Sequence, residues 1–253
     1  MAIACSLGAT PLHAQADRDA AYVRGNVLFE QGDYAGAEKL YRGLAEAGHR
    51  SEELYFNLGN TLFRLQRPGE AALWYHRALA LDPRFGEARQ NLRVVENLTG
   101  NLVFDPGDLV RWLRRLTPAD LAGLVSLFAW IALLCAASVL ALPRLKPWRP
   151  LLWIVTLLSV TAVGFFLWCL RRYDRDVSID RMAIVTAPET KAITSPYPDA
   201  KEVIALPPGS EVRIVLDRGP WTFVAIPDEL RGWVRTETIG RVVPEPAAGP
   251  DQG

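Results

Sequence analysis

Residues 52–83 read EELYFNLGNTLFRLQRPGEAALWYHRALALDP, and this stretch decides the fold of the N-terminal part of the chain. An earlier stretch repeats its pattern, because Gly25 aligns with Gly59 and Tyr41 aligns with Tyr75 at a period of 34 residues. Each unit contains two amphipathic segments. We therefore expect two pairs of helices that stack on one another, since neither pair can bury its apolar face alone.

The second unit resembles the tetratricopeptide repeat almost position by position. The residues that carry this resemblance are Tyr55, Leu58, Gly59, Ala71, Tyr75, Ala78 and the closing Pro83. The resemblance implies that small residues let the helices approach closely, while large aromatic residues fill the space beside them. We assign the repeats to residues 17–99 and expect residues 84–97 to form a polar capping helix, because Arg93 occupies the glycine position there.

Tetratricopeptide arrays usually bind an extended or helical segment in their concave groove, and the resemblance implies such a groove here. The residues expected to face it are Tyr22, Asn26, Phe29, Glu53, Phe56, Asn57, Asn60 and Phe63. Asn26 and Asn57 match two positions of the clamp by which some family members hold a peptide carboxylate. Tyr22 occupies the lysine position of that clamp, which disfavours a receptor for chaperone tails. The alternative is that both asparagines are ordinary helix-surface residues.

Two stretches without a charged residue, 121–142 and 151–170, are long enough as helices to cross a bilayer. The alternative, a pair of buried core helices, is disfavoured by their length. The connection at residues 143–150 contains Arg144, Lys146 and Arg149 and no acid, so the positive-inside rule places this hairpin in the cytoplasm. Both flanking regions would then be periplasmic, on a bacterial inner membrane. The reversed topology is the alternative.

Three further segments flank these parts. Residues 1–16 end in the small-x-small sequence Ala-Gln-Ala, which predicts a signal peptide, although a positively charged start is missing. The alternative there is a frayed tail. Residues 100–120 combine apolar residues with arginines and are expected to form an amphipathic helix on the membrane surface, or else a linker. We expect residues 244–253 to be disordered.

Residues 181–243 contain short β-branched runs separated by turn residues, which predicts a small all-β barrel. Their order resembles a bacterial SH3-type domain, with Gly232-Trp233-Val234 in place of the family's Gly-Trp-Val and Trp221 opening the preceding strand. Tyr197, Trp221 and Trp233 could line an aromatic groove for peptide or cell-wall ligands. The alternative is that both tryptophans close the core of the barrel.

The composition excludes several classes of function. The 28 Lys and Arg residues balance 28 Asp and Glu residues, whereas nucleic-acid-binding proteins usually carry a basic surplus. Three cysteines and three histidines are too few and too scattered for a disulfide scaffold or a zinc ligand set. The sequence also has none of the usual nucleophile, phosphate-binding or metalloprotease motifs. We therefore predict no catalytic residues, no metal and no cofactor.

The order of signal, repeats, surface helix, two-span hairpin and SH3-type domain resembles the tetratricopeptide members of the Bat family of bacterial aerotolerance operons. The resemblance implies a non-enzymatic inner-membrane scaffold. Its partners would be von Willebrand A-domain membrane proteins and a MoxR-type ATPase, with a role in the cell envelope or in stress tolerance. The alternative function is binding or sensing of peptidoglycan peptides through the SH3-like domain.

Overall fold

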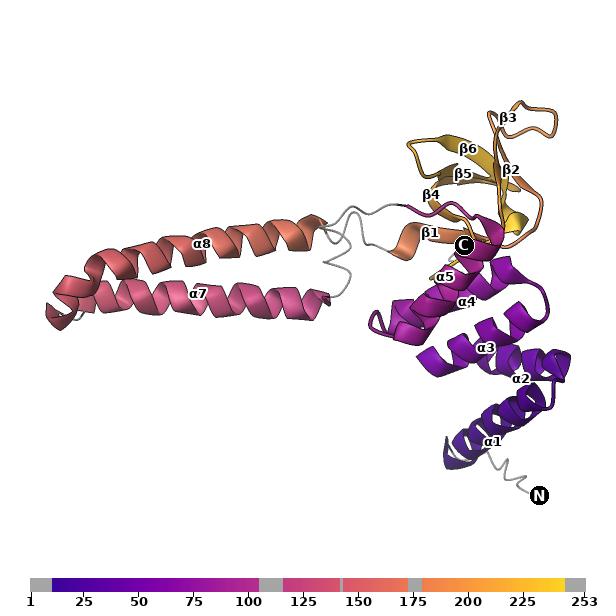
Figure 1. The fold of residues 1–253 in the computed structure, drawn as a ribbon, viewed down its shortest axis with the longest axis horizontal. Coiled ribbons are helices and arrows are strands. Elements are labelled where there is room, and N and C mark those ends of the chain that lie inside the picture. The colour runs from indigo at the N-terminus through magenta and orange to yellow at the C-terminus, as the bar shows by residue number, and fades with distance from the viewer. Residues whose placement is uncertain (1–10, 105–115, 142, 173–178, 244–253) are drawn as a thin grey trace, which may run out of the picture. The chain divides into compact units, whose positions relative to one another are not determined.

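The computed structural model describes residues 11–104, 116–141, 143–172 and 179–243. The chain divides into two compact units (Figure 1). The first unit combines residues up to Phe104 with residues from Ile179 onward, and the second consists of the chain between them. The predicted disordered tail at residues 244–253 and most of the predicted signal peptide lie outside the described residues.

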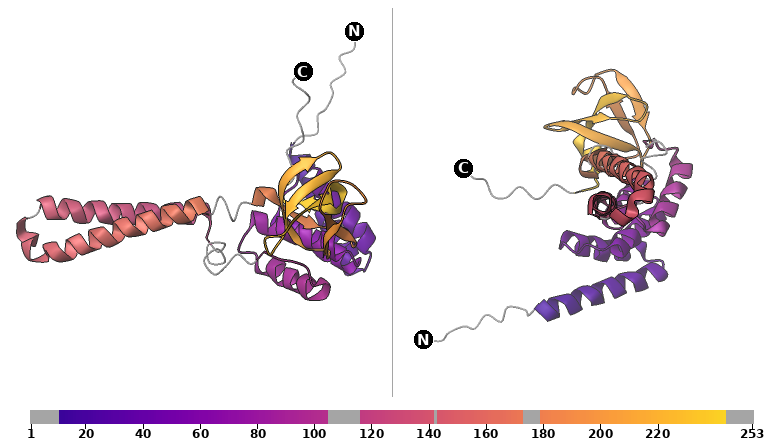
Figure 2. Two further views of the ribbon diagram at one scale, coloured as in Figure 1. Left: turned by 90° about the horizontal axis from the view of Figure 1, so that it is seen from above. Right: turned by 90° about the vertical axis from the view of Figure 1, so that its left-hand side faces the viewer.

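Five helices build the N-terminal part of the first unit, and each packs against the next (Figures 1 and 2). They are α1 (Pro11–Glu30), α2 (Tyr34–Glu46), α3 (Glu52–Arg64), α4 (Pro68–Leu81) and α5 (Gly86–Thr99). Asp33 caps α2 by accepting a bond from the Gly36 amide at 2.9 Å, and Ser51 caps α3 in the same way through the Leu54 amide at 3.1 Å. These helices have the pairwise order expected of tetratricopeptide repeats, with α5 as the predicted capping helix.

The two aligned glycines allow the close helix packing that the repeat pattern predicts. A Cβ atom on Gly25 would lie 2.6 Å from Cε1 of Tyr41, and one on Gly59 would lie 2.6 Å from Cε1 of Tyr75. Both tyrosine side chains are almost fully buried. Each ring therefore occupies the space that the missing glycine side chain leaves, as expected.

The C-terminal part of the first unit is a seven-stranded antiparallel sheet with the strand order β3-β2-β6-β5-β4-β1-β7. The strands are β1 (Met182–Val185), β2 (Thr190–Ile193), β3 (Glu202–Leu206), β4 (Glu211–Arg218), β5 (Trp221–Ala225), β6 (Arg231–Arg235) and β7 (Ile239–Arg241). Five of them match the predicted runs. Strands β2 and β7 were not predicted, because they have only four and three residues and include charged or glycine positions.

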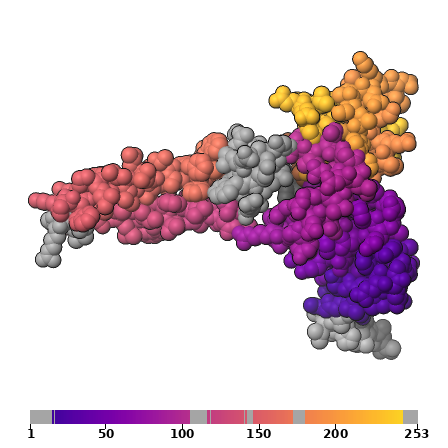
Figure 3. Space-filling model, in the orientation of Figure 1, coloured from indigo at the N-terminus to yellow at the C-terminus, as the bar shows by residue number. Residues whose placement is uncertain are grey.

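The repeat helices and the sheet pack directly against each other. Strand β1 is buried on both faces: Met182 and Ile184 join the apolar core of the helices, while Ala183 and Val185 join that of the sheet. In the space-filling view the sheet (orange to yellow) lies against the later repeat helices (Figure 3). The predicted repeat domain and the predicted barrel therefore form one folded unit.

Helix α4 makes most of this contact. A Cβ atom on Gly69 would lie 2.7 Å from the carbonyl oxygens of both Val185 and Thr186, so the α4 backbone touches the end of β1. Arg77 stacks over the Trp74 ring at 4.4 Å and donates a hydrogen bond of 2.9 Å to the Arg241 carbonyl. The interface thus combines apolar burial with a bond to the sheet backbone.

The chain that follows α5 also belongs to this interface. Leu102 pairs with the start of β4, since its carbonyl accepts a bond of 2.8 Å from the Glu211 amide and its own amide donates to Oγ of Ser210 at 3.0 Å. The Asn101 side chain donates to the Gly209 carbonyl at 2.7 Å. Residues 100–104, assigned above to a membrane-surface helix, therefore contact the sheet, and residues 105–115 lie outside the described residues.

The second unit is a helical hairpin. Helix α7 (Pro118–Ala141) and helix α8 (Arg149–Arg172) contain the two predicted apolar stretches, and the 3₁₀ helix η1 (Pro143–Trp148) connects them. Two windows, Ala119–Val139 and Lys146–Arg171, are long and apolar enough to span a membrane, and only 6% of each is buried. In this respect they differ from the core helices of a soluble protein, which are mostly buried.

Candidate partner-binding groove

Asn26 is the centre of a hydrogen-bonded group in the first repeat unit. Its Oδ1 accepts a bond of 2.6 Å from the Tyr41 hydroxyl and one of 3.3 Å from Nδ2 of Asn57. Asn57 also donates to the Tyr22 hydroxyl at 2.9 Å. Because tyrosine and amide donors both point at Oδ1, the orientation of the Asn26 side chain is fixed.

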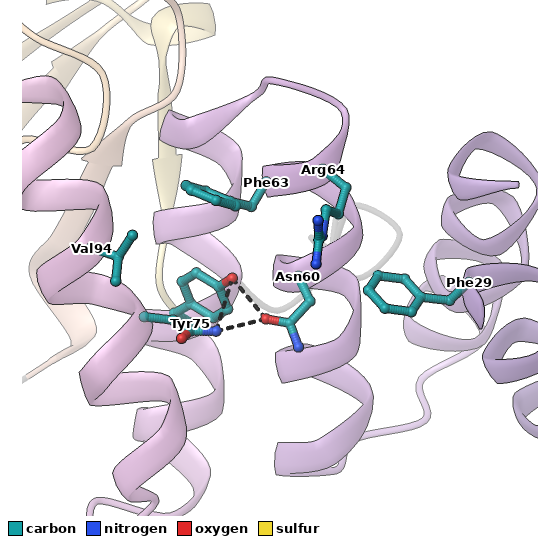
Figure 4. Close-up of a pocket in the computed structure, with 7 residues that line it drawn as sticks. Phe29, Asn60, Phe63, Arg64, Tyr75 and Val94 are labelled. Carbon is teal, nitrogen blue, oxygen red and sulfur yellow. Dashed lines mark hydrogen bonds between the residues drawn. The ribbon is translucent and has the colours of Figure 1, made fainter. Parts of the chain in front are cut away.

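The same group recurs one repeat later. Oδ1 of Asn60 accepts bonds of 2.8 Å from the Tyr75 hydroxyl and 2.8 Å from Nδ2 of Asn91 (Figure 4). Asn91 follows Asn57 by one repeat period, as Asn60 follows Asn26. The helices α1, α3 and α5 therefore present a ladder of amides, in which Asn26 and Asn60 each accept a bond from a tyrosine of the outer helix behind them.

Burial keeps the two tyrosines of the ladder protonated. It raises the pKa of Tyr75 to about 12, and the same effect, assisted by the nearby Tyr22 and Glu30, raises the pKa of Tyr41 to about 12. Both hydroxyls therefore remain hydrogen-bond donors over the whole physiological pH range. The amide oxygens of Asn26 and Asn60 stay occupied, and their Nδ2 groups are left for other acceptors.

Two pockets open along this ladder. The larger has a volume of about 470 Å³ and is lined by Phe29, Asn60, Phe63, Arg64, Tyr75, Asn91 and Val94 (Figure 4). The smaller, of about 190 Å³, is lined by Asn26, Phe29, Glu30, Tyr41 and Asn57. The linings are equivalent by the repeat period, and Phe29 belongs to both. They differ in charge, because Glu30 in the smaller pocket corresponds to Arg64 in the larger.

The structure brings five of the predicted groove residues to these pockets, namely Asn26, Phe29, Asn57, Asn60 and Phe63. The other three, Tyr22, Glu53 and Phe56, line neither pocket: Glu53 is exposed, and Tyr22 and Phe56 are half-buried. Tyr22 supports Asn57 and packs at 5.9 Å on the ring of Tyr41, and Phe56 packs at 5.2 Å edge-on to Phe85. At the lysine position of the peptide clamp, this chain therefore has a half-buried ring that supports Asn57.

Sequence reasoning missed Arg64, Asn91 and Val94 of the larger pocket. The repeat period would have found Asn91, because it aligns with Asn57, and Val94, because it aligns with Asn60. The sequence indicated less clearly that Arg64 belongs to the groove. It ends α3 at a position where a basic residue also suits the helix dipole, so its place in the groove needed the fold.

The three aromatic residues proposed for the C-terminal domain do not form one site. Trp233 packs at 5.1 Å on Phe223, Trp221 lies 5.2 Å beneath the Arg235 guanidinium, and no ring contact joins either to the exposed Tyr197 in the part of the chain that the structure describes. The alternative of core-closing tryptophans is also wrong. Both are partly exposed, while Thr222, Val224 and Val234 point into the sheet core.

Metal-ligating side chains do not gather in the described ranges, where no group of three His, Cys, Asp or Glu residues is placed to hold an ion. What the groove offers is amide donors, aromatic surface and two opposite charges. These groups can bind a polypeptide backbone and its side chains.

Comparison with known proteins supports the repeat assignment. Residues 10–52 and 22–84 match a family model described as tetratricopeptide repeat. No curated protein matches the chain. The matched residues cover α1–α4, where the glycine–tyrosine packing and the amide ladder recur at the repeat period. The N-terminal part of this chain is therefore a tetratricopeptide-repeat domain.

Proposed function

We propose that this protein is a non-enzymatic, membrane-anchored adaptor that holds a segment of a partner protein in its tetratricopeptide groove. The observation that carries the proposal is the pair of repeat-equivalent pockets, which are open although the amides beside them are already oriented. Preoriented donors bind a peptide at a lower entropic cost than mobile ones. Tetratricopeptide repeats themselves suggest a scaffold for protein–protein interaction.

The second unit supplies the anchor in this proposal. The hairpin leaves the first unit after Phe104 and returns to it at Ile179, so two crossings would place repeats and sheet on one side of the membrane. Because Arg144, Lys146 and Arg149 lie in the connection, we propose that this side is the periplasm. The family resemblance suggests a Bat-type complex containing von Willebrand A-domain proteins and a MoxR-type ATPase.

Val94 offers a way to test the groove. It is 47% exposed and lines the larger pocket, whereas Leu98, one turn further along α5, is 63% exposed and lines neither pocket. The full-length chain, its Val94→Arg variant and its Leu98→Arg variant are each cross-linked in membranes and purified. We expect Val94→Arg to lose the bound protein and Leu98→Arg to keep it. Equal recovery from both variants would contradict binding in the groove.

The topology is tested with single cysteines. Tyr197→Cys in the sheet and Arg24→Cys in α1 are introduced one at a time into a Cys5→Ser/Cys169→Ser background that keeps Cys135, and a membrane-impermeant thiol reagent is added to spheroplasts. We expect both positions to react before lysis, while Cys135 within α7 serves as the shielded control. Reaction only after lysis would show a cytoplasmic domain, and reaction at one position alone would contradict a shared side.

One observation favours a second function for the sheet. Leu216, which is 55% exposed, pairs with Phe223, and Phe223 pairs with Trp233, so an apolar stripe crosses strands β4, β5 and β6 on their outer face. We propose that, as the SH3-type resemblance suggests, this face binds cell-wall peptides. Isolated sacculi should retain the full-length chain and release Leu216→Glu. Tyr197→Ala, which alters no residue of this stripe, should be retained; equal retention of all three forms would reject the idea.

A further inference from the structure

The proposal made here rests on the groove function and specifies the partner. We propose that the groove selects a segment of a partner protein that carries opposite charges at its two ends. A basic side chain would lie beside Glu30, an acidic side chain beside Arg64, and an apolar side chain over Phe29 between them. The chain would thus bind its partner segment in one direction only.

The first support is the placement of the two charges. Glu30 and Arg64 occupy equivalent positions one repeat apart, and each lines one of the two pockets. Both side chains are exposed, and neither has an oppositely charged partner within 4.0 Å among the residues that the structure describes. By contrast, Glu38 on α2 is paired with both Arg42 and Arg67. The two unpaired charges are therefore available to a ligand.

The hydrogen-bonding groups that the amides leave free are the same in both pockets. In the larger pocket, Asn60 keeps its Nδ2 donors and Asn91 keeps its Oδ1 acceptor. In the smaller pocket, Asn26 keeps the equivalent donors and Asn57 the equivalent acceptor. The amides can therefore bind a peptide backbone in either pocket, and the pockets differ in charge: Arg64 suits a carboxylate, whereas Glu30 suits an ammonium or a guanidinium.

The two charges act in opposite directions on the buried tyrosines of the ladder. The negative charge of Glu30 adds to the burial that raises the pKa of Tyr41, whereas the positive charge of Arg64 opposes the burial that raises the pKa of Tyr75. The groove therefore has a negative half and a positive half. Phe29, which is common to both pockets, lies at their junction.

The arrangement differs from a clamp for a chain-terminal carboxylate. Such a clamp would need a basic residue at Tyr22 and further ones on α5, where this chain has Glu87 and Asn91. The only basic residue lining either pocket in the described part of the chain is Arg64, one repeat away from the Asn26–Asn57 pair. An internal segment with two side-chain charges fits this distribution better than a free terminus does.

The test uses the full-length chain in detergent micelles and three synthetic peptide pools of equal length with a central leucine. In the first pool Arg precedes and Glu follows the leucine, in the second the order is reversed, and in the third Gln replaces both charges. We expect the protein to bind one charged pool about tenfold more tightly than the other, since each partly exposed ion pair changes affinity only a few-fold. The double variant Glu30→Arg/Arg64→Glu should prefer the opposite order.

A matched control swaps two exposed charges outside the groove, Lys39→Glu with Glu46→Lys on α2, and should keep the original preference. Equal binding of both charged pools, or an unchanged preference in the groove variant, would overturn the proposed polarity while leaving groove binding intact. Binding of none of the pools would overturn the proposal for such segments. The comparison of Val94→Arg with Leu98→Arg then decides independently whether the groove binds any partner.

Discussion

Helices α2 and α4 occupy equivalent places in the two repeat units, yet their outer faces differ. Helix α2 carries Glu38 and Lys39 where α4 carries Ala72 and Leu73, which are buried. On the inner face the units agree, because Ala37 and Tyr41 align with Ala71 and Tyr75 and all four are buried. The residues of the inner face therefore follow the repeat pattern, whereas those of the outer face depend on which part of the protein packs against them.

The sheet is what covers α4. Gly69 aligns with Ala35 of α2, and only Gly69 has strand carbonyls close enough to exclude a Cβ atom. A tetratricopeptide unit can thus acquire a second interface by changing outer residues alone, since the helix pair keeps its own packing. The same glycine-to-alanine substitution should therefore change stability by different amounts at different glycines of the repeats.

The largest effect is expected for Gly69→Ala, which gives α4 the residue that α2 already has. The added Cβ would lie 2.7 Å from two backbone oxygens, so helix and strand must separate, and we expect a loss of about 3 kcal/mol of stability. Denaturant unfolding of the full-length chain in micelles measures it. Gly43→Ala is the control, because no atom lies within 4 Å and the change should stabilise α2 by up to about 1 kcal/mol. Equal effects of both would contradict the interface.

A smaller difference should separate Gly59→Ala from Gly25→Ala. Each added Cβ would lie 2.6 Å from a tyrosine ring. Tyr75 is held between α3 and α5, whereas α1 has no helix on its far side within the described residues and can move away. We expect losses of about 2 kcal/mol for Gly59→Ala and about 1 kcal/mol for Gly25→Ala, measured by the same unfolding. A larger effect at Gly25 would show that the first unit is the more constrained.

The buried tyrosines on the shared inner face, Tyr41 and Tyr75, should lose their protons over the same alkaline pH range. Because the pKa of Tyr41 and that of Tyr75 are raised to about 12 from 10.0, their protonated forms stabilise the folded state below pH 10, and this contribution is lost as the pH rises through 12. The ultraviolet absorbance of tyrosinate should therefore show a late step. The variant Tyr41→Phe/Tyr75→Phe should lack that step. If the step persists in it, these tyrosines are not its source.

The smallest effect is expected for Glu38→Gln. This change removes a charge from α2 at a position where α4 has the uncharged Ala72. Burial alone would raise the pKa of Glu38, but hydrogen bonds from Arg42 and the charges of Arg42 and Arg67 lower it overall. Its contribution is therefore present above pH 4.5 and lost as the pH falls below that value. We expect a loss of at most about 1 kcal/mol at pH 7 that vanishes at low pH. Lys39→Gln, an exposed neutralisation on the same helix, is the control; a loss independent of pH would contradict an ionic cause.

The helical part was predictable because its contacts are local and repeat. Gly59 and Tyr75 recur one period after Gly25 and Tyr41, so the repeat indicates their positions. The lengths of the two apolar stretches, around Leu121 and Leu157, can be read directly from the sequence. The sheet was harder, because β2 and β7 are short and exist only through pairing with distant strands. The helix–sheet interface was missed, although a comparison of Glu38-Lys39 with Ala72-Leu73 would have indicated a second buried face on α4.

In the groove, the repeat period identified Asn26, Asn57 and Asn60 but not the bonds that orient them. Those bonds come from Tyr41 and Tyr75 on neighbouring helices, and nothing in the local sequence states which amide atom they engage. The opposite charges at Glu30 and Arg64 were visible in the sequence. Their significance required the pockets that they line.

The pairing of distant segments in the first unit has a consequence for how the chain is made. The bond between Arg77 and Arg241 joins residues 164 positions apart, and the one between Asn101 and Gly209 joins residues 108 positions apart. During translation, Leu73 leaves the ribosome long before Gly240 of β7, against which it packs. The apolar hairpin is synthesised in the interval. The repeat domain therefore reaches its final packing only after the hairpin has been made, and a chain that stops short of β1 would keep an uncovered α4 for chaperones or proteases to recognise.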